Sequence, residues 1–546
     1  MNMNNKTAMM GVCAAAGALL PLAQACDKKP QKPNLIVIMT DQQRADALGI
    51  VGKYPFLQTP NLDRLARSGV HFVNAYTPCA VSGPARASLL TGLLVEHTGV
   101  LTNAFVSEDP VENHFTTLPT YAQLIARAGW RTEYHGEWHS PSMWLDCYEG
   151  LQWAPKKNRP FSFFMEEQRV YDQMLQDKYG NAPKVPGAMM EHTKKVQYMP
   201  DAIDRRVLRG TGPDGELTPE EAARRIQTQP DNHGMLLVDD EDSQTAYQGR
   251  LAVQAVRDMK DSDRPFFLTL SFNYPHSPMV PTAKYYNMYK REDMPVPASI
   301  GDTFTDSPYV SQNGRLQLPE YSDPELIKYM MTSYFGLVSE IDYWVGEILD
   351  ALEEIGQTEN TMVVFLSDHG EMLGDHGMRE KNVFYEGSAK VPLIISYPAK
   401  IKPRTVTDNI TTLDLFATLM DYMGIKEAKE VRRDSRSLRP LMEGRHRKEG
   451  DFTVTEWLYN GTRMPSHMIM KDGWKLFFNY SKDSKVPPVL FNLNEDPDEM
   501  HNLLGKSNPE REKYFAKAEE LKAVMLGWLS ERNSSYVDQI KEVEFK

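Results

Sequence analysis

Apolar runs of strand length alternate along the chain with segments of helical periodicity. The first run, residues 34–40 (NLIVIMT), is continuous and ends at Asp41. Such a run is typical of a parallel strand buried on both faces. Similar runs lie at 266–272, 362–367 and 391–397, and helical patterns lie at 61–67, 118–128, 325–354 and 413–423. This alternation predicts an α/β fold with a large, mostly parallel sheet flanked by helices.

The pattern changes beyond about residue 446. Short alternating segments at 467–470 and 474–479 are separated by Lys-Asp-Gly, which is a hairpin signal, and 509–531 has helical spacing. We therefore predict a main α/β domain at 33–445 and a small C-terminal α+β domain at 446–546, with an antiparallel sheet covered by a helix.

Composition narrows the class of protein. The chain has 546 residues, of which 41% are hydrophobic and 25% charged, as in an average globular protein with a large core. The net charge of -13 argues against a nucleic-acid partner, because phosphate backbones are bound by clustered Lys and Arg. An anionic substrate must therefore be attracted by a local site. Residues 140–260 are charged and weakly periodic, which favours insertions and loops around such a site.

The first residues have the pattern of an export signal. Lys6 supplies a positive start, residues 8–22 are apolar, and 23–25 (AQA) form a small-residue cleavage pattern. We predict a signal peptide at 1–25 and an exported, periplasmic or extracellular protein. A transmembrane anchor is the weaker alternative, because the apolar run is short and contains Pro21.

A lipid anchor is a second possibility at the same place. Residues 22–26 (LAQAC) resemble a relaxed bacterial lipobox, in which Cys26 becomes the lipidated first residue. The pattern leaves an outer-membrane lipoprotein and simple soluble export equally open. Contact with a membrane is expected only through this anchor.

The sharpest chemical signal is the segment 82–92 (SGPARASLLTG). Pro84 suits the first turn of a helix and Gly92 its end, so Ser82 should lie just before a helix N-terminus. Free backbone N–H groups and the helix dipole favour an anion there. Taken alone, Ser82 could equally be a simple N-cap.

Two polar clusters follow predicted strands, at 41–44 (DQQR) and 367–370 (SDHG). Ligands of open α/β sheets bind at the carboxyl ends of the strands. Carboxylates together with an amide oxygen form a set suited to Ca²⁺ or Mg²⁺. Either cluster alone would more often consist of loop-capping residues.

Together these motifs resemble the sulfatase family, in the form of the formylglycine-dependent, serine-type bacterial sulfatases of the alkaline phosphatase superfamily. The family signature has Cys or Ser, any residue, Pro or Ala, any residue and Arg, followed by Leu and Thr-Gly, and residues 82–92 fit it. Cys79 does not have the right spacing. The resemblance extends to 490–504 and implies an alkaline-phosphatase-like fold. It also implies a maturation enzyme that oxidises Ser82 to formylglycine.

The implied chemistry explains why an unmodified serine is insufficient. A hydrated aldehyde has two hydroxyls on one carbon: one attacks sulfur and expels the alcohol, and the other expels sulfate as the aldehyde re-forms. The metal ligands that the resemblance implies are Asp41, Gln42, Ser82, Asp368 and His369. Gln42 stands where many members have Asp, and His369 where some have Asn. The expected ion is Ca²⁺, with Mg²⁺ as the alternative.

The resemblance also implies residues that handle sulfate. Residues 275–278 (PHSP) match a Pro-His-x-Pro element, which makes His276 a sulfate contact and a candidate acid for the leaving oxygen. Lys381 matches the lysine before a Tyr-Glu-Gly run. With Ser82, Arg86 and His139, these two residues complete the expected catalytic set.

One motif departs from the family. The usual Gly-Lys-Trp-His is here 136–139 (GEWH), so His139 carries over while Glu137 replaces a lysine. We expect Glu137 to bind substrate together with His139, His276 and Lys381, and to be accommodated by pairing with a neighbouring base or by accepting hydrogen bonds from sugar hydroxyls. The alternative is a loop residue that faces solvent.

The resulting hypothesis is a sulfatase that acts on a sulfated carbohydrate, such as a glycosaminoglycan, mucin or algal glycan. One alternative is a phosphodiester or phosphonate monoester hydrolase of the same superfamily. Another, motivated by Glu137, is an inactive protein that binds sulfated glycans. The intact segment 82–86 and both polar clusters argue against inactivity.

Overall fold

The computed structural model describes most of the chain after residue 31, and residues Pro33–Lys546 form one compact unit. The expected signal peptide at 1–25 and the expected lipid anchor at Cys26 lie outside the described residues. Among the described helices, none is both long and apolar enough to cross a membrane. The described residues are 32–103, 115–150, 166–191, 194–200, 211–212, 215–216, 233–309, 323–448, 450–460 and 464–546.

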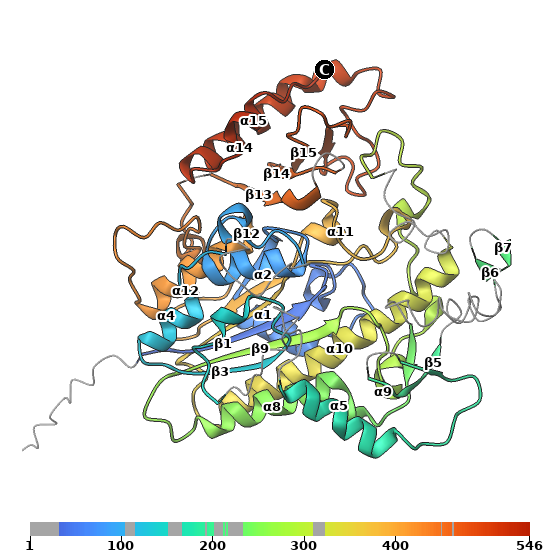
Figure 1. Cartoon of the computed structure of the whole chain (residues 1–546), viewed down its shortest axis with the longest axis vertical. Coiled ribbons are helices and arrows are strands. Elements are labelled where there is room, and N and C mark those ends of the chain that lie inside the picture. The colour runs from blue at the N-terminus through green and yellow to red at the C-terminus, as the bar shows by residue number, and fades with distance from the viewer. Residues whose placement is uncertain are drawn as a thin grey trace, which may run out of the picture. The chain divides into compact units, whose positions relative to one another are not determined.

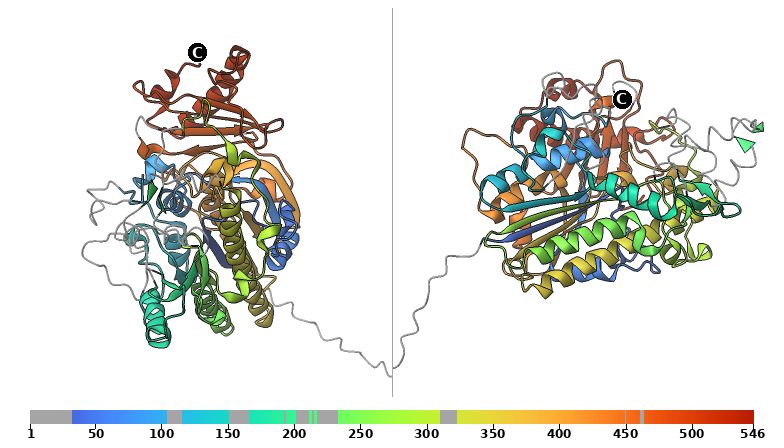
Figure 2. Two further views of the ribbon diagram at one scale, coloured as in Figure 1. Left: turned by 90° about the vertical axis from the view of Figure 1, so that its right-hand side faces the viewer. Right: turned by 60° about the horizontal axis from the view of Figure 1, so that its bottom comes forward.

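The centre of the molecule is a seven-stranded sheet (Figures 1 and 2). All adjacent strands pair in parallel except at β11, which is antiparallel to both of its neighbours. The predicted large, mostly parallel sheet is thus confirmed. The strand order is β12 (Arg404–Thr411), β2 (Val70–Tyr76), β11 (Leu393–Ser396), β10 (Thr361–Ser367), β1 (Asn34–Asp41), β9 (Phe266–Pro275) and β3 (Arg131–Gly136).

The strand expected at 391–397 exists as β11, but the expectation that it is parallel is wrong. The connection from β10 to β11 contains only a 3-10 turn, η7 (Asp375–Gly377), and a short helix, α11 (Glu386–Ala389), and no element that carries the chain back across the sheet. The chain therefore returns from the end at which β10 finished, and β11 pairs with it in the antiparallel sense. A continuous apolar run reports burial on both faces and not strand direction.

Helices cover both faces of the sheet. Successive side chains of a strand point to opposite faces, so the continuous apolar strands present apolar side chains on both. In β1, Leu35, Val37 and Met39 enter one core, while Ile36 and Ile38 enter the other. The first core is completed by α2 (Ser82–Thr91), α4 (Tyr121–Arg127) and α12 (Leu415–Met423). The second is completed by α1 (Pro60–Ser68), α8 (Gln244–Asp258) and α10 (Pro324–Glu354).

The expectation that 140–260 consists of loops is wrong for α8, and a further helix, α5 (Glu166–Tyr179), lies in the same range. Ala252 and Val256 of α8 are fully buried in the core below the sheet. Figure 1 shows α8 running beside α10 along this face. Residues 140–260 thus supply part of the core as well as connections.

The C-terminal part forms a four-stranded antiparallel sheet. The predicted hairpin is present between β14 and β15, whose turn places Asp472 and Gly473 at positive φ (53° and 78°). Leu521 and Met525 of the helix α14 (Phe515–Glu531) pack on this sheet (Figure 1), so the predicted covering helix is confirmed. The strands are β13 (Phe452–Glu456), β14 (His467–Lys471), β15 (Trp474–Phe478) and β16 (Val489–Asn492).

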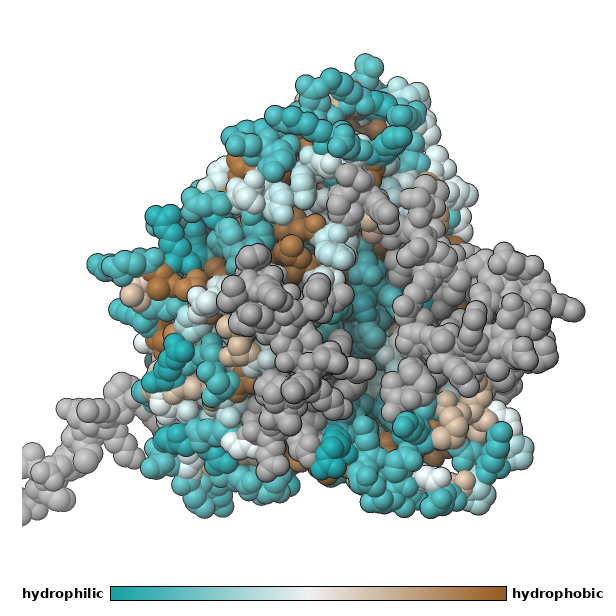
Figure 3. All heavy atoms as spheres, viewed as in Figure 1, coloured by the Kyte–Doolittle hydropathy of each residue, from teal (hydrophilic) through white to brown (hydrophobic). Residues whose placement is uncertain are grey.

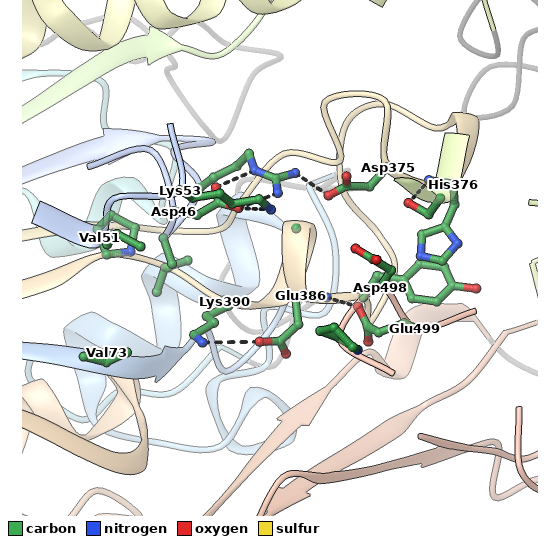
Figure 4. A pocket seen from close by; sticks show the side chains of 18 of the residues that line it. Asp46, Val51, Lys53, Val73, Asp375, His376, Glu386, Lys390, Asp498 and Glu499 are labelled. Atoms are coloured by element: carbon green, nitrogen blue, oxygen red, sulfur yellow. Dashed lines mark hydrogen bonds and ion pairs between the residues drawn. The ribbon is translucent and has the colours of Figure 1, made fainter. Parts of the chain in front are cut away.

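A buried ion network joins this small sheet to the main sheet's connections. Lys475 of β15 is fully buried and lies 2.7 Å from carboxylate oxygens of both Glu386 and Glu499. The same charge holds the pKa of Glu386 far below its ordinary value, to about 2, against the opposing effect of burial. A cavity of about 230 Å³ lies beside the network, and most of its charged side chains are paired, as Lys390 is with Glu386 (Figure 4).

The face drawn in Figure 3 is mostly hydrophilic among the described residues. Hydrophilic residues are also visible near the middle of this face, and hydrophobic residues gather only in small separate areas.

Candidate active site

Two parallel strands bring the two aspartates of the site together. Asp41 ends β1 and Asp368 follows β10, which is the direct neighbour of β1. The backbone N–H of Gln42 donates to Asp368 Oδ1 over 3.2 Å and ties the two strand ends to each other. Gln42 has a φ of 71°, so the chain turns sharply as it leaves the sheet.

Ser82 is the first residue of α2, with Val81 as the N-cap, so it lies one position further into the helix than expected. Its Oγ is 3.0 Å from Asp41 Oδ2 and 2.9 Å from His369 Nε2. Gly92 ends the helix at a φ of 65°, as predicted. The helix N-terminus therefore points its first side chain at the aspartate cluster.

Arg86 lies one turn along the same helix and is only 1% exposed. Its guanidinium donates to Asp368 Oδ2 (2.9 Å), Asp41 Oδ2 (3.2 Å) and Glu137 Oε2 (3.0 Å). Burial alone would lower the pKa of Arg86, but the three carboxylates, Asp368 foremost, raise it above its ordinary value. Arg86 thus stays charged and partly neutralises a strongly acidic cluster.

The donors around Asp41 fit a divalent cation. Ligand atoms of Asp41, Asp368 and His369 all lie within 4.8 Å of one another and are buried. Asp41 Oδ1 has no hydrogen-bond partner among the described residues, as expected of an atom reserved for a cation. His369 Nδ1 lies 3.0 Å from Gly370 O and must carry the proton, which leaves the Nε2 lone pair for the site.

The charge of Asp41 is maintained by its surroundings. Burial would raise its pKa, but His276, His369 and Arg86 together hold that pKa well below the ordinary value. Ser82 adds its hydroxyl beside Asp41, whereas the amide oxygen of Gln42 accepts from Lys381 Nζ. Asp41, Ser82, Asp368 and His369 of the expected donor set thus lie together, and hard oxygens with one imidazole suit Ca²⁺ or Mg²⁺.

Glu137, the residue that departs from the family motif, lies inside the buried cluster around Arg86. Glu137 is 8% exposed, follows β3 and pairs with Arg86, so the solvent-facing alternative is wrong. Burial, and then the negative charge of Asp41, raise the pKa of Glu137 well above its ordinary value. Ligand atoms of Asp41, Glu137 and His139 also lie within 4.8 Å of one another. Burial and the charge of Arg86 lower the pKa of His139, which favours a neutral ring.

His276 and Lys381 form a pair on the other side of Gln42. Lys381 Nζ lies 2.7 Å from His276 Nε2 and donates to Gln42 Oε1 over 2.6 Å. His276 Nδ1 donates to Ser277 O over 2.7 Å, so Nε2 is the acceptor for the ammonium. Burial first, and Lys381 second, lower the pKa of His276 to about 4. At neutral pH the His276 ring is therefore neutral.

Sequence reasoning missed several contacts of these residues. Ser271 Oγ accepts from Arg86 Nη1 over 2.9 Å, and Asn103 Oδ1 accepts from the N–H of Gly83 over 2.8 Å. Glu371 accepts a hydrogen bond from the Gln42 side chain. Only Glu371 left a signal, because it follows the polar cluster at 367–370 directly. Ser271 lies within an apolar strand, where a single serine has no distinguishing pattern.

Comparison with known proteins agrees with this arrangement. Residues 33–425 match the sulfatase family, and 374–524 match a family described as N-sulphoglucosamine sulphohydrolase, C-terminal. The chain is 29% identical over 524 residues to an arylsulfatase of Clostridium perfringens, with 93% of this chain and 96% of that protein covered. It is 26% identical over 566 residues to an N-acetylglucosamine-6-O-sulfatase of Bacteroides thetaiotaomicron, with 97% and 92% covered.

Solved structures share the fold. A phosphonate monoester hydrolase of Agrobacterium radiobacter superposes with a TM-score of 0.68 at 23% identity, with 92% of this chain and 96% of that chain covered. The family match covers more than half of the chain, and the relatives are matched over nearly their whole length. The chain therefore belongs to the sulfatase family of the alkaline phosphatase superfamily and is a sulfuric ester hydrolase.

Proposed function

We propose that this sulfatase removes sulfate from a sulfated carbohydrate, with a formylglycine derived from Ser82 as the nucleophile and a bound divalent cation, Ca²⁺ or Mg²⁺. The observation that carries the proposal is the meeting of Ser82 Oγ with Asp41 and His369 at the ends of two parallel strands. A small polar nucleophile beside a buried set of cation donors is what sulfate ester hydrolysis requires.

Each residue of the site has a distinct task in this proposal. Asp41, Gln42, Asp368 and His369 would hold the cation together with residue 82. When bound, the cation would draw charge from the sulfate oxygens and favour the ionised form of the nucleophile. Arg86 holds two of these carboxylates in place through its fork of N–H groups. The modification would supply the second hydroxyl that releases sulfate.

The leaving alcohol needs a proton, and the pair of Lys381 and His276 can deliver it. Lys381 Nζ lies 2.7 Å from His276 Nε2, so either group can present a proton to the departing oxygen, directly or through the other. Their side of the site also carries positive charge toward the sulfate. Ligand atoms of His139 and Glu137 lie within 4.8 Å of those of Asp41, and these two residues would contact the substrate there.

The carbohydrate substrate is inferred from the names of similar proteins and from the expected export. One relative at near full coverage is an N-acetylglucosamine-6-O-sulfatase, and the C-terminal family is named after an N-sulphoglucosamine sulphohydrolase. Export through the signal peptide at 1–25, followed by soluble release or lipidation at Cys26, would bring the enzyme to such glycans in the periplasm or outside the cell.

The nucleophile is tested by peptide mass spectrometry of active protein. We expect a loss of two hydrogens at Ser82, introduced by the maturation enzyme. Ser82→Cys should raise activity in a host whose maturation system accepts only cysteine, and Ser82→Ala is the inactive control. Full activity of a protein with unmodified serine would refute the mechanism.

The substrate class is tested by desulfation of defined monosaccharides and disaccharides from glycosaminoglycans, mucins and algal glycans. Aryl sulfate, aryl phosphate and phosphonate esters provide the comparison. Turnover of a sugar sulfate well above that of the aryl esters supports the proposal. Preferential turnover of phosphonate esters would favour the phosphonate monoester hydrolase alternative, and no turnover of any ester by matured protein would favour the glycan-binding alternative.

A further inference from the structure

Glu371 is a fully buried carboxylate just outside the proposed cation donors. It follows Asp368-His369-Gly370 directly and has an exposed fraction of 0%. Its Oε1 accepts from the backbone N–H of Leu373 over 3.0 Å and from the N–H of Glu380. The carboxylate is therefore fixed in direction by its own loop, and its second oxygen is left to point at another partner.

That partner is the side-chain amide of Gln42, whose Nε2 donates to Glu371 Oε2. The other end of the amide, Oε1, accepts from Lys381 Nζ over 2.6 Å. The backbone of Gln42 is held on both sides, since its N–H donates to Asp368 Oδ1 and its carbonyl accepts from Tyr334 Oη over 3.0 Å. The remaining freedom of this side chain is the exchange of its oxygen and nitrogen by rotation of the terminal amide.

The hydrogen-bonding groups beside the Gln42 amide determine which of its two orientations is adopted. A primary amide has two ends of similar size but opposite hydrogen-bonding character. An ammonium only donates and a carboxylate only accepts, so Lys381 and Glu371 both select the orientation that is present. An amide nitrogen turned toward a cation would contribute no lone pair and would repel the ion.

We propose that Glu371 is a positioning residue that keeps the amide oxygen of Gln42 available to the cation and thereby sets the affinity of the site. This inference rests on the proposed function, in which Gln42 is a cation ligand. A purely structural reading, in which Glu371 only anchors the N–H groups of Leu373 and Glu380, makes a different prediction. It expects a loss of stability on substitution, without a specific loss of cation affinity and without dependence on residue 42.

Glu371→Gln separates the two readings. The new side chain keeps an oxygen for the two backbone N–H groups but turns an NH₂ group toward the NH₂ group of Gln42. Two donors then face each other, so the Gln42 amide is expected to flip. The double variant Gln42→Glu with Glu371→Gln restores complementarity, because the amide of residue 371 then donates to a carboxylate at residue 42. The total charge of the pair is the same as in the wild type.

The experiment measures the dissociation constants of Ca²⁺ and Mg²⁺ by isothermal titration calorimetry, on full-length protein that carries unmodified Ser82. Thermal unfolding in the presence of a chelator gives the metal-independent stability. We expect Glu371→Gln to weaken cation binding about 10-fold or more, as is usual for residues that orient metal ligands. The double variant should recover to within about 3-fold of the wild type, and the unfolding temperature in chelator should change little.

A double-mutant cycle with Gln42→Ala provides the control. In that background Glu371 has no amide to orient, so Glu371→Gln should change the dissociation constant less than about 2-fold. If Glu371→Gln does not fold, recovery of folding and cation affinity by the double variant carries the test, and lack of recovery overturns the proposal. Unchanged cation affinity in Glu371→Gln, or an equal loss in the Gln42→Ala background, also overturns it.

Failure of the underlying cation site has a different signature. Asp368→Ala should remove detectable cation binding whatever the role of Glu371. Undiminished binding in Asp368→Ala would refute the proposed cation site and the positioning role together. Loss in Asp368→Ala with no loss in Glu371→Gln would refute the positioning role alone.

Discussion

Arg86→Lys is the substitution whose effect on the free energy of unfolding is best defined by the structure. Arg86 makes five hydrogen bonds in a buried setting, to Asp368, to Asp41, to Ser271 and to both the side chain and the backbone carbonyl of Glu137. A lysine ammonium has only three N–H groups and cannot imitate the planar fork. At least two of the five bonds are therefore lost, although the positive charge is kept.

The size of the stability loss follows from the buried acceptors that lose their hydrogen bond to Arg86. Each buried polar group that loses its hydrogen bond costs about 1–3 kcal/mol, so Arg86→Lys should lower the free energy of unfolding by about 2–6 kcal/mol. Urea denaturation of unmatured protein in chelator measures this quantity directly. Activity is a poorer assay, because Arg86 belongs to the segment that the proposed maturation enzyme recognises, and a loss would combine two effects.

A matched control is available on the surface. Arg64 pairs with Asp350 at 2.8 Å, and its side chain is 45% exposed. Arg64→Lys should change the free energy of unfolding by less than about 0.5 kcal/mol, as is usual for exposed ion pairs. A loss below about 1 kcal/mol in Arg86→Lys, or a loss no larger than that of Arg64→Lys, would refute the reasoning that the buried fork organises the site.

Three further predictions concern charge, substrate and metal. Burial raises the pKa of Glu340 to about 8 from 4.5, so between these pH values the folded state retains a proton that the unfolded state has lost. The free energy of unfolding should therefore fall by up to about 5 kcal/mol as pH rises from 4.5 to 8. Glu340→Gln should flatten the pH dependence of the urea midpoint between about pH 5 and pH 8.5. A profile as steep as that of the wild type would contradict this. Glu137→Gln should reduce turnover of the sugar sulfate more than that of a small aryl sulfate, whereas equal losses would indicate that Glu137 acts only as the partner of Arg86. Chelation should abolish ester hydrolysis and added Ca²⁺ or Mg²⁺ should restore it; activity that persists in chelator would exclude an essential exchangeable cation.

The elements that the sequence predicted well are those buried on both sides or long enough to show a period. β1, β9 and β10 are continuous apolar strands in the interior of the sheet, and α10 repeats its apolar stripe over many turns. The edge strand β3 was missed because Arg131, Glu133 and His135 occupy its outward positions and interrupt the apolar run. Charged side chains of this kind protect an open sheet edge.

α8 was missed for a different reason. Apart from Val253 and Val256, its buried positions are filled by Ala, Gly, Gln and Thr in place of large apolar residues, since it packs closely against α10. At Gly249 an added Cβ would lie 2.3 Å from the ring of Trp344, so the close approach of the two helices requires a glycine. Small residues that permit close packing weaken the hydrophobic period by which a helix is recognised.

In the site, too, some residues could be predicted from the sequence and others could not. Residues 82–86, Asp41 and Asp368 could be predicted because their chemistry is concentrated in short motifs at the ends of elements. The partners that orient them, such as Ser271 for Arg86, come from elsewhere in the chain and are chosen by the fold. Their identity depends on which strands are neighbours, and a single sequence contains no direct record of that order.

The connection between β10 and β11 has a consequence for how such enzymes can be recombined. It begins with Asp368 and His369, passes through Lys381, and ends near Glu386, whose carboxylate contacts Lys475 of the C-terminal sheet. The C-terminal sheet is therefore part of the scaffold of a catalytic loop. A chimera with a C-terminal region from a relative would leave Glu386 buried opposite an unmatched residue unless the donor also supplies a lysine and its second carboxylate, Glu499. The two regions must therefore be exchanged as one unit.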